Sequence, residues 1–334
     1  MPALAVARAL NERGVDVTFA GSPDRVEARL VPEAGYELDT FRITGLPRRP
    51  SVALARALLL AGSAPIACRR ILRRRQPDIV LGAGGFVAGP MVFAASRLRI
   101  PTALTEADAH LGLANRLAAP FARKLFLAYP IASRYARKSQ VVGRPLPPHE
   151  EVSQAEAREI FELPPDVPVL GVFGALAGAT ALNEFVVETW AANGPAILHQ
   201  TGARDYESVK RRVSRPDYRV IPATDRFNAA LTACDLVLAR AGSSVWEIAA
   251  AGRPAILVPY PFATGDHQAR NAEHFEHAGG AIMVREQSLG RVPELVRSLL
   301  GDTERREKMS RAMLGAARPD AAAEIADALI ELAR

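Results

Sequence analysis

Residues 240–261 read RAGSSVWEIAAAGRPAILVPYP, and this stretch decides the fold. A turn of small residues at 242–244 opens an apolar run of helical length that contains a single acid, Glu247. The short apolar runs on either side, 236–239 and 255–258, are typical of strands buried in a parallel sheet. Strand, small-residue turn, helix and second strand form the repeating unit of such a sheet. The stretch therefore predicts an α/β fold.

The same alternation continues along the 334 residues, which are too many for one ordinary core. A proline-rich segment, GRPLPP at 143–148, divides the chain, and Ser153 after it is suited to cap a new helix. Candidate strands lie at 15–20, 79–81, 102–105, 125–128, 169–173, 196–200, 219–221, 236–239, 255–258 and 281–284. We predict two Rossmann-like, doubly wound domains, 1–146 and 147–334, facing a cleft.

The chain begins with a helical pattern at 2–13 rather than with a strand. The first strand of a parallel sheet usually takes a central position in it. We therefore expect a strand and the loop after it to precede Pro2, so that the first domain lacks both.

Charge narrows the choice of partners. The formal net charge is +6, but few aromatic residues accompany the basic ones and no helix-turn-helix or RNA-binding motif is present, which argues against nucleic acid. A basic cluster directly follows an apolar tract at 51–67, as suits an anionic membrane surface; a solvated helix end is the alternative. The cluster comprises Arg69, Arg70, Arg73, Arg74 and Arg75.

No apolar run reaches the roughly 18 to 20 residues that cross a bilayer, and the N-terminal pattern is not that of a signal peptide. The two cysteines, Cys68 and Cys234, are far apart and match no metal-ligand spacing. Their pattern indicates a reducing compartment. We expect a cytoplasmic protein without a bound metal.

The turn Gly242-Ser243-Ser244 and the acid after it are the first candidate site. Backbone amides at a helix start, with two hydroxyls, can hold a phosphate. Glu247 follows about one turn later, where a carboxylate can accept hydrogen bonds from the two vicinal hydroxyls of a ribose. The alternative is an acid that caps the helix and is stabilised by its dipole.

Two loops of the first half carry candidate acceptor-side groups. The loop GAGGFVAGP at 82–90 contains Gly84 and Gly85, whose amides can bind a diphosphate or simply allow a tight turn. The loop TEADAHLGLANR at 105–116 offers several side chains that can take a proton from a hydroxyl. These are Glu106, Asp108 and His110, with Asn115 nearby. Asp108 and Asn115 are alternatively helix caps.

Two loops of the second half carry further candidate ligand-binding groups. In GALAGATALN, 174–183, Gly174 and Gly178 enclose apolar residues, so a ligand there would meet the backbone. The segment 259–275 places Asp266, His267, Gln268 and Asn271 at a helix start. Amide side chains suit sugar hydroxyls because they both donate and accept hydrogen bonds. For Asp266, a simple helix cap is the alternative.

These motifs together, RAGSSVWEIAAAGRPAILVPYP, GDHQARNA, GAGGFVAGP and EADAHLGLANRL, resemble the MurG family over most of the chain, Pro2 to about Val284. The resemblance implies a GT-B fold and an inverting, metal-independent hexosyltransferase without a cofactor. The family moves N-acetylglucosamine from UDP-GlcNAc to a polyprenyl-diphosphate-linked muramoyl-peptide (lipid I to lipid II). That reaction serves peptidoglycan synthesis, and hence cell wall biogenesis, cell division and cell shape. The resemblance also implies peripheral attachment to the cytoplasmic face of the membrane.

The resemblance assigns roles to particular residues. It implies that Glu247 binds the ribose and that Gln268, flanked by Asp266 and His267, binds the donor sugar. On the acceptor side it implies Gly84 and Gly85 for the diphosphate, and Glu106 and Asn115 for the remaining polar contacts. The run 52–60 matches the membrane-facing apolar patch.

Several positions depart from the family pattern. The family's first glycine loop, with its histidine, would precede Pro2, so the catalytic base is expected among Glu106, Asp108 and His110. Leu176 and Ala177 replace the serine and glutamine of GGSQGA, and TEAD at 105–108 replaces HEQN. The loop before Glu247 is one residue shorter. Pro147 stands at the linker arginine, where Arg144 is a possible substitute on the donor side.

These departures leave two further readings. One is a related GT-B transferase with another lipid or a small-molecule acceptor. The other is a non-catalytic relative that binds nucleotide sugar.

Overall fold

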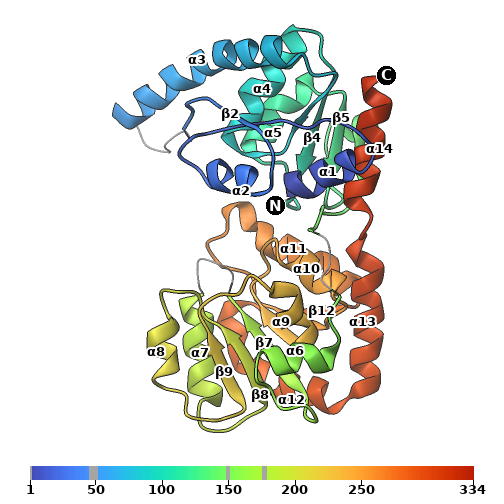
Figure 1. Ribbon diagram of the computed structural model, residues 1–334. Helices are drawn as coiled ribbons and strands as arrows, with labels where there is room; N and C mark the ends of the chain where they lie inside the picture. The colour runs from blue at the N-terminus through green and yellow to red at the C-terminus, as the bar shows by residue number, and fades with distance from the viewer. Residues whose placement is uncertain (1, 45–51, 148–150, 175–178) are drawn as a thin grey trace. The chain divides into compact units, whose positions relative to one another are not determined.

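The computed structural model describes residues 2–44, 52–147, 151–174 and 179–334, with the side chains at 52–59, 61 and 264 left out (Figure 1). The chain forms two compact units. The first comprises Met1–Pro147 and Pro319–Arg334, and the second comprises Pro148–Arg318. Each unit carries a parallel sheet with helices around it, as the alternating pattern predicts.

The sheet of the second unit has the order β12-β11-β10-β7-β8-β9, and all of its neighbouring strands run parallel. Its strands are β7 (Val169–Phe173), β8 (Ala196–Gln200), β9 (Tyr218–Ile221), β10 (Leu236–Ala239), β11 (Ala255–Leu257) and β12 (Ala281–Met283). All were predicted to within one residue at each end. From β7 the chain adds β8 and β9 on one side, then returns to add β10, β11 and β12 on the other. The order therefore reverses between β7 and β10.

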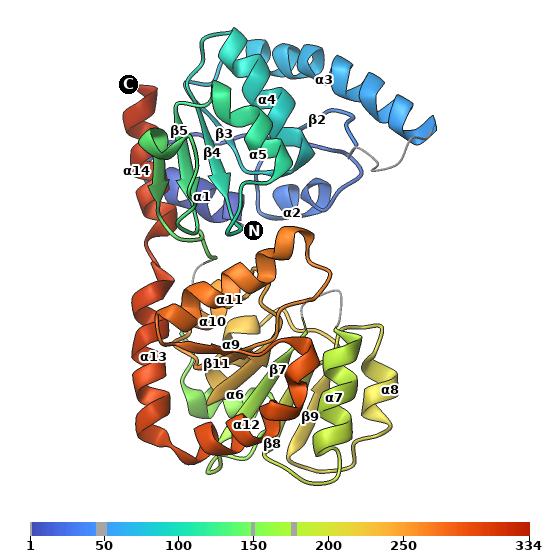
Figure 2. The same ribbon diagram turned by 180° about the vertical axis from the view of Figure 1, so that it is seen from behind.

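Among the helices of the second unit, α6 precedes the strands in sequence, α7 to α11 alternate with them, and α12 and α13 follow the last strand (Figure 2). They are α6 (Gln154–Ile160), α7 (Thr180–Trp190), α8 (Tyr206–Lys210), α9 (Phe227–Ala233), α10 (Val245–Ala250), α11 (His267–His277), α12 (Val292–Gly301) and α13 (Thr303–Ala317), with the 3-10 turns η3 (Thr264–Asp266) and η4 (Glu286–Arg291). Ser153 caps α6 as predicted, because its hydroxyl accepts from the amide of Glu156 and the Glu156 carboxylate bonds back to the Ser153 amide.

In the first unit, β3 (Val80–Gly82), β4 (Thr102–Glu106), β5 (Lys124–Leu127) and β6 (Ser139–Val141) form one parallel sheet in that order. A second sheet pairs β1 (Phe19–Gly21) with β2 (Leu38–Thr40). The helices are α1 (Pro2–Asn11), α2 (Glu27–Glu33), α3 (Val52–Arg75), α4 (Gly85–Arg97) and α5 (Leu113–Ala118), with the 3-10 turns η1 (Ala119–Phe121) and η2 (Ala136–Lys138).

Strand β2 escaped prediction because it buries an acid, Asp39. Arg75 Nε donates to Asp39 Oδ2 at 2.8 Å, Arg74 also pairs with this carboxylate, and Arg75 forms a second ion pair with Glu37. The hydrogen bond from Arg75 holds the pKa of Asp39 below its ordinary value. Two arginines of the predicted membrane-facing cluster thus pair with acids of the protein, although only Arg75 is half-buried and Arg74 stays exposed with Arg69, Arg70 and Arg73.

The last helix, α14 (Ala321–Ala333), belongs to the first unit, whereas the sequence placed it in the second domain, 147–334. Ile325 and Leu329 pack in one core cluster with Val6 and Leu10 of α1, so helices α1 and α14 lie side by side in both views (Figures 1 and 2). Asp327 also pairs with Arg13 at 2.6 Å. An apolar helix face shows that a helix is covered, but not which sheet covers it.

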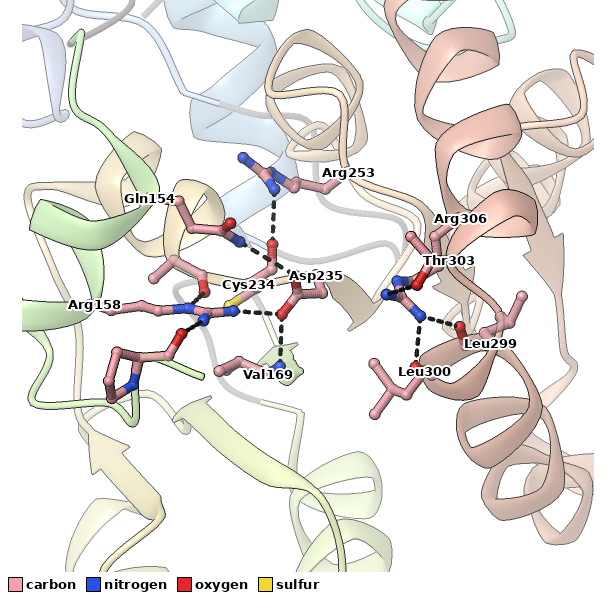
Figure 3. A network of polar contacts seen from close by, with 12 residues as sticks. Gln154, Arg158, Val169, Cys234, Asp235, Arg253, Leu299, Leu300, Thr303 and Arg306 are labelled. Carbon is pink, nitrogen blue, oxygen red and sulfur yellow. Dashed lines mark hydrogen bonds and ion pairs between the residues drawn. The ribbon is translucent and has the colours of Figure 1, made fainter. Parts of the chain in front are cut away.

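A buried network fastens α6 to the starts of β7 and β10 (Figure 3). Arg158 is 8% exposed, and its Nη2 lies 2.7 Å from Asp235 Oδ2. The same oxygen accepts from the Val169 amide at 2.7 Å, and Gln154 Nε2 donates to Asp235 Oδ1 at 3.2 Å. One carboxylate therefore joins the two central strands and the first helix after the linker.

Removing this carboxylate leaves the Arg158 charge buried without its partner. We expect Asp235→Ala to lower the free energy of unfolding of the second unit by on the order of 3 kcal/mol. Both tryptophans of the chain, Trp190 and Trp246, lie in this unit, so urea denaturation followed by tryptophan fluorescence measures it directly. Glu159→Ala, at an exposed acid on α6, is the control, and equal losses in the two variants would contradict the prediction.

Candidate functional site

In the second unit, the reversal of strand order predicts a ligand-binding site at the carboxyl ends of the strands. In a doubly wound sheet, ligands bind at the carboxyl ends of the strands where the order reverses, because the loops there leave in opposite directions. Here that point lies between β7 and β10, which pair from Leu170↔Leu236 to Phe173↔Ala239. The loop that starts at Gly174 and the turn at 242–244 follow these two strands directly. Both had been selected from the sequence.

The single acid of the apolar run, Glu247, lies on helix α10. Val245, Trp246, Ile248 and Ala249 are buried in the unit, whereas Glu247 is only half-buried. The turn before it is accessible too, because Gly242 and Ser244 are half-buried and Ser243 is exposed. The Ser244 hydroxyl makes no capping hydrogen bond at the helix start. The turn and the carboxylate are therefore accessible to a ligand on this side of the sheet.

Gln268 of α11 lies beside this turn with a defined orientation. Its Oε1 accepts a hydrogen bond from the Tyr260 amide at 2.9 Å, which a side-chain NH₂ could not do. The Nε2 atom is on the Gly242 side, 3.9 Å from where a Cβ at Gly242 would stand. Among the described residues no hydrogen-bond acceptor is recorded for Nε2. Gln268 therefore offers hydrogen-bond donors at the turn.

Two neighbours of Gln268, Asn271 and Asp266, bond to other groups of the protein. Asn271 was predicted to contact the ligand, but it is fully buried and its Nδ2 donates to the Ala241 carbonyl at 3.2 Å, so it holds the turn. Asp266 has a left-handed backbone and makes no capping bond; its carboxylate pairs with Arg285 at 3.0 Å. His267 is half-buried at the first position of α11.

Gly174, the residue that follows β7, lies too close to Ala179 to carry a side chain. A Cβ at Gly174 would stand 2.8 Å from the Ala179 Cβ and 3.0 Å from the Ala179 nitrogen. Gly178, Leu176 and Ala177 lie outside the described residues. Where the loop enters α7, Thr180 Oγ1 donates to Asp205 Oδ2 at 2.9 Å. The far end of this loop is therefore tied to the loop that follows β8.

Asp205 also belongs to a buried network of polar side chains that the sequence analysis did not identify. His199 of β8 has Nδ1 2.9 Å from the Tyr218 hydroxyl and Nε2 3.0 Å from Asn183 Oδ1. Asn183 Nδ2 in turn donates to the Thr201 carbonyl and to Asp205, both at 2.9 Å. Burial lowers the pKa of His199 to about 3, so the ring stays neutral. A histidine inside the apolar strand run 196–200 was the available signal.

In the first unit, Gly84 and Gly85 form the predicted turn between β3 and α4. Gly84 has φ 88° and ψ −174°, a region that essentially only glycine occupies, and Gly85 has φ 70°. Arg144 is half-buried in the segment after β6. The predicted patch 52–60 lies in α3, with its side chains at 52–59 outside the described residues.

Glu106 was a candidate base, but its carboxylate already accepts four hydrogen bonds. Oε1 accepts from the amides of Ala107 (3.0 Å) and Asp108 (3.3 Å), and Oε2 accepts from Gly112 (2.8 Å) and from Asn115 Nδ2 (2.9 Å). These four hydrogen bonds tie the Glu106 carboxylate to its own loop.

Asn115 is buried within the same loop and also donates to the Thr105 carbonyl at 2.9 Å, so it neither caps α5 nor faces solvent. Asp108 and His110 are half-buried in this loop.

The neutral state of His199 makes stability depend on pH. Below about pH 6.5 the unfolded chain takes up a proton that the folded chain refuses until about pH 3. Stability should therefore fall with decreasing pH in that window, by up to about 1.4 kcal/mol per pH unit, and this histidine should cause no loss above it.

His199→Gln removes this contribution, so its free energy of unfolding should approach that of the parent chain as the pH is lowered. Urea denaturation monitored by tryptophan fluorescence across this window measures the difference. Exposed His277→Gln serves as the control. If the free energies of unfolding of the parent chain and His199→Gln differ by the same amount at every pH, the assignment of a neutral, buried His199 would be refuted.

The chain matches two family models, the glycosyltransferase family 28 N-terminal domain over residues 1–127 and its C-terminal domain over 169–325. The protein named "UDP-N-acetylglucosamine--N-acetylmuramyl-(pentapeptide) pyrophosphoryl-undecaprenol N-acetylglucosamine transferase" of Acidithiobacillus ferrooxidans (strain ATCC 53993) is 42% identical, covering 99% of this chain and 94% of that protein. Its namesake from Halothermothrix orenii is 36% identical, covering 92% and 89%.

The crystal structure of Acinetobacter baumannii MurG matches with a TM-score of 0.75 at 25% identity, covering 99% of this chain and 95% of that one. This likeness confirms the predicted GT-B fold of two Rossmann-like domains. Since both halves are matched by the models of one family, the chain belongs to glycosyltransferase family 28.

Proposed function

We propose that this glycosyltransferase moves N-acetylglucosamine from UDP-GlcNAc to a polyprenyl-diphosphate-linked muramoyl-peptide, the step from lipid I to lipid II in peptidoglycan synthesis. The names of its near full-length relatives describe this transfer. One structural observation carries the proposal. At the strand reversal of the second unit, a half-buried carboxylate follows a small-residue turn, and the Gln268 amide places its NH₂ group on the Gly242 side of that turn.

Each of these groups suits one part of a UDP-sugar. The Glu247 carboxylate accepts hydrogen bonds from the ribose hydroxyls, as acids near such turns do in nucleotide-binding sheets. The hydroxyls of Ser243 and Ser244 and the amides of the turn donate to the diphosphate. Gln268 donates through Nε2 to an oxygen of the sugar.

The transfer itself requires an acceptor hydroxyl to attack the anomeric carbon while UDP leaves from the opposite side. Donors at the turn stabilise the negative charge that develops on the departing diphosphate. The hydroxyl proton goes to a base on the acceptor side, which we assign to Asp108 or His110, since the Glu106 carboxylate is held by its own loop. Gly84 and Gly85 contribute amides for the acceptor diphosphate.

We also propose peripheral attachment to the cytoplasmic membrane face through the first unit. Among the described helices, none is long and apolar enough to cross a membrane. Five large apolar side chains are nevertheless exposed on α4, α5 and η1, namely Phe86, Phe93, Leu113, Leu117 and Phe121, and the rings of Phe93 and Phe121 pack edge to face at 5.2 Å. Exposed arginines, Arg97 and Arg116, lie on α4 and α5, and Arg123 follows η1. Apolar and basic groups together favour an anionic lipid surface.

Transfer of labelled N-acetylglucosamine from UDP-GlcNAc to lipid I tests the function. Glu247→Ala should abolish most of this transfer and weaken UDP binding about 30-fold, since a hydrogen bond to a charged group is worth roughly 1.5–3 kcal/mol. Titration calorimetry measures the affinity, and tryptophan fluorescence verifies that the second unit stays folded. Unchanged affinity would remove the nucleotide assignment, and transfer only to other acceptors would remove the lipid I assignment.

Two comparisons sharpen this test. Glu294→Ala changes an exposed acid in the first turn of α12 and should leave UDP affinity unaltered. The parent chain should prefer UDP over 2′-deoxy-UDP, and Glu247→Ala should lose that preference, because the carboxylate reads the ribose hydroxyls. A preference that survives in Glu247→Ala would place the ribose elsewhere.

For membrane attachment, Leu113→Asp combined with Leu117→Asp should reduce sedimentation with phosphatidylglycerol-containing vesicles about tenfold or more. Each change removes an apolar side chain from the interface and adds a repelled charge. Both leucines are more than 60% exposed, so the fold should tolerate the changes. Val167→Asp, at an exposed apolar position of the second unit, is the control. If both proteins lose binding equally, the first unit has no special part in attachment.

A further inference from the structure

Arg240 is a buried arginine that joins the ends of three neighbouring strands. It follows β10 directly and is 5% exposed. Its Nη1 lies 3.4 Å from the Val258 carbonyl and 3.3 Å from the Pro259 carbonyl, just beyond β11. Its Nη2 pairs with Glu286, which follows β12. The strand ends that it joins are those at which the turn and Gln268 lie.

The same guanidinium also contacts the residue that orients Gln268. Its Cζ lies 5.6 Å from the centre of the Tyr260 ring, while the Tyr260 amide donates to Gln268 Oε1 at 2.9 Å. Because Pro259 and Tyr260 are adjacent, the hydrogen bond to the Pro259 carbonyl and the ring contact hold this stretch of backbone from two sides. The direction of the Tyr260 N–H decides which end of the Gln268 amide faces the turn.

Only an arginine satisfies this arrangement. A guanidinium is planar and carries five N–H donors, so it can serve two carbonyls and a carboxylate while one face rests on a ring. A lysine ammonium is a compact charge and cannot make these contacts together. A buried charge also needs its partner, which the Glu286 carboxylate provides.

We propose that Arg240 is a positioning residue for the donor sugar. Held between Glu286 and the carbonyls after β11, it fixes the Tyr260 backbone and thereby turns the NH₂ group of Gln268 toward the sugar. This inference rests on the proposed function, since it names what Gln268 meets. Arg240 itself does not touch the substrate; it acts through Tyr260 and Gln268.

A role limited to stability and a positioning role predict different binding data. If Arg240 positions Gln268, Arg240→Lys should weaken UDP-GlcNAc binding about threefold to tenfold, the value of one neutral hydrogen bond, and leave UDP binding unchanged. In a Gln268→Ala background, Arg240→Lys should have no further effect on UDP-GlcNAc, because the group that it orients is gone. Titration calorimetry with both ligands gives the four-variant cycle.

Arg215→Lys is a matched control. Arg215 is also largely buried, donates to the carbonyls of Trp190, Gly194 and Pro195, and pairs with Asp217 at 2.8 Å before β9, at the opposite edge of the sheet. Its replacement should lower stability and leave both affinities unaltered. Glu286→Gln weakens the same arrangement from its other end and substitutes for Arg240→Lys if that variant does not fold, as judged by tryptophan emission.

The outcomes separate the two ideas. Equal losses for UDP and UDP-GlcNAc, or a loss that persists in the Gln268→Ala background, would overturn the positioning role while the proposed function stands. A parent chain that binds neither ligand would overturn the proposed function, and the inference with it.

Discussion

The parallel pairing of β7 with β10 is the constraint on which the second unit depends. It brings the carboxyl ends of two strands that are distant in the sequence to the same end of the sheet, at the point where the strand order reverses. At the other edge Asp235 accepts from the Val169 amide and pairs with Arg158, so the register of this pair is fastened by a buried charge. The site at the carboxyl edge is a consequence of this pairing.

Near the carboxyl ends of these strands, buried polar groups fix the positions of the loops that form the candidate site. Asn271 holds the carbonyl before the turn, Arg240 holds the strand ends beside Gln268, and the chain through His199 and Asn183 holds the entrance of α7. Each group is satisfied by a specific partner, and an unpaired one would be costly in this interior. These side chains act through position, whereas Glu247 and Gln268 are the residues proposed to contact the ligand.

The first unit follows the same principle on the acceptor side. Glu106 has the residue type of a base, yet its four hydrogen bonds make it the organiser of its loop. Asp39 has the residue type of a surface acid, yet two arginines bury it in a strand. In both cases, the carboxylate forms hydrogen bonds or ion pairs with other groups of the protein.

The sequence alone determined the strands of the second unit, the small-residue turn with its acid, and the family, because these depend on local periodicity and on motifs within a few residues. The same local patterns did not determine which sheet α14 covers or that Asn271 is buried. They also did not determine that the Glu106 carboxylate accepts four hydrogen bonds, or that Arg240 joins the ends of three strands. Each of these depends on a partner far away in the chain, such as Asp327 for Arg13 or Glu286 for Arg240. Side-chain type states which bonds a residue can make; only the tertiary structure decides which partner comes within reach.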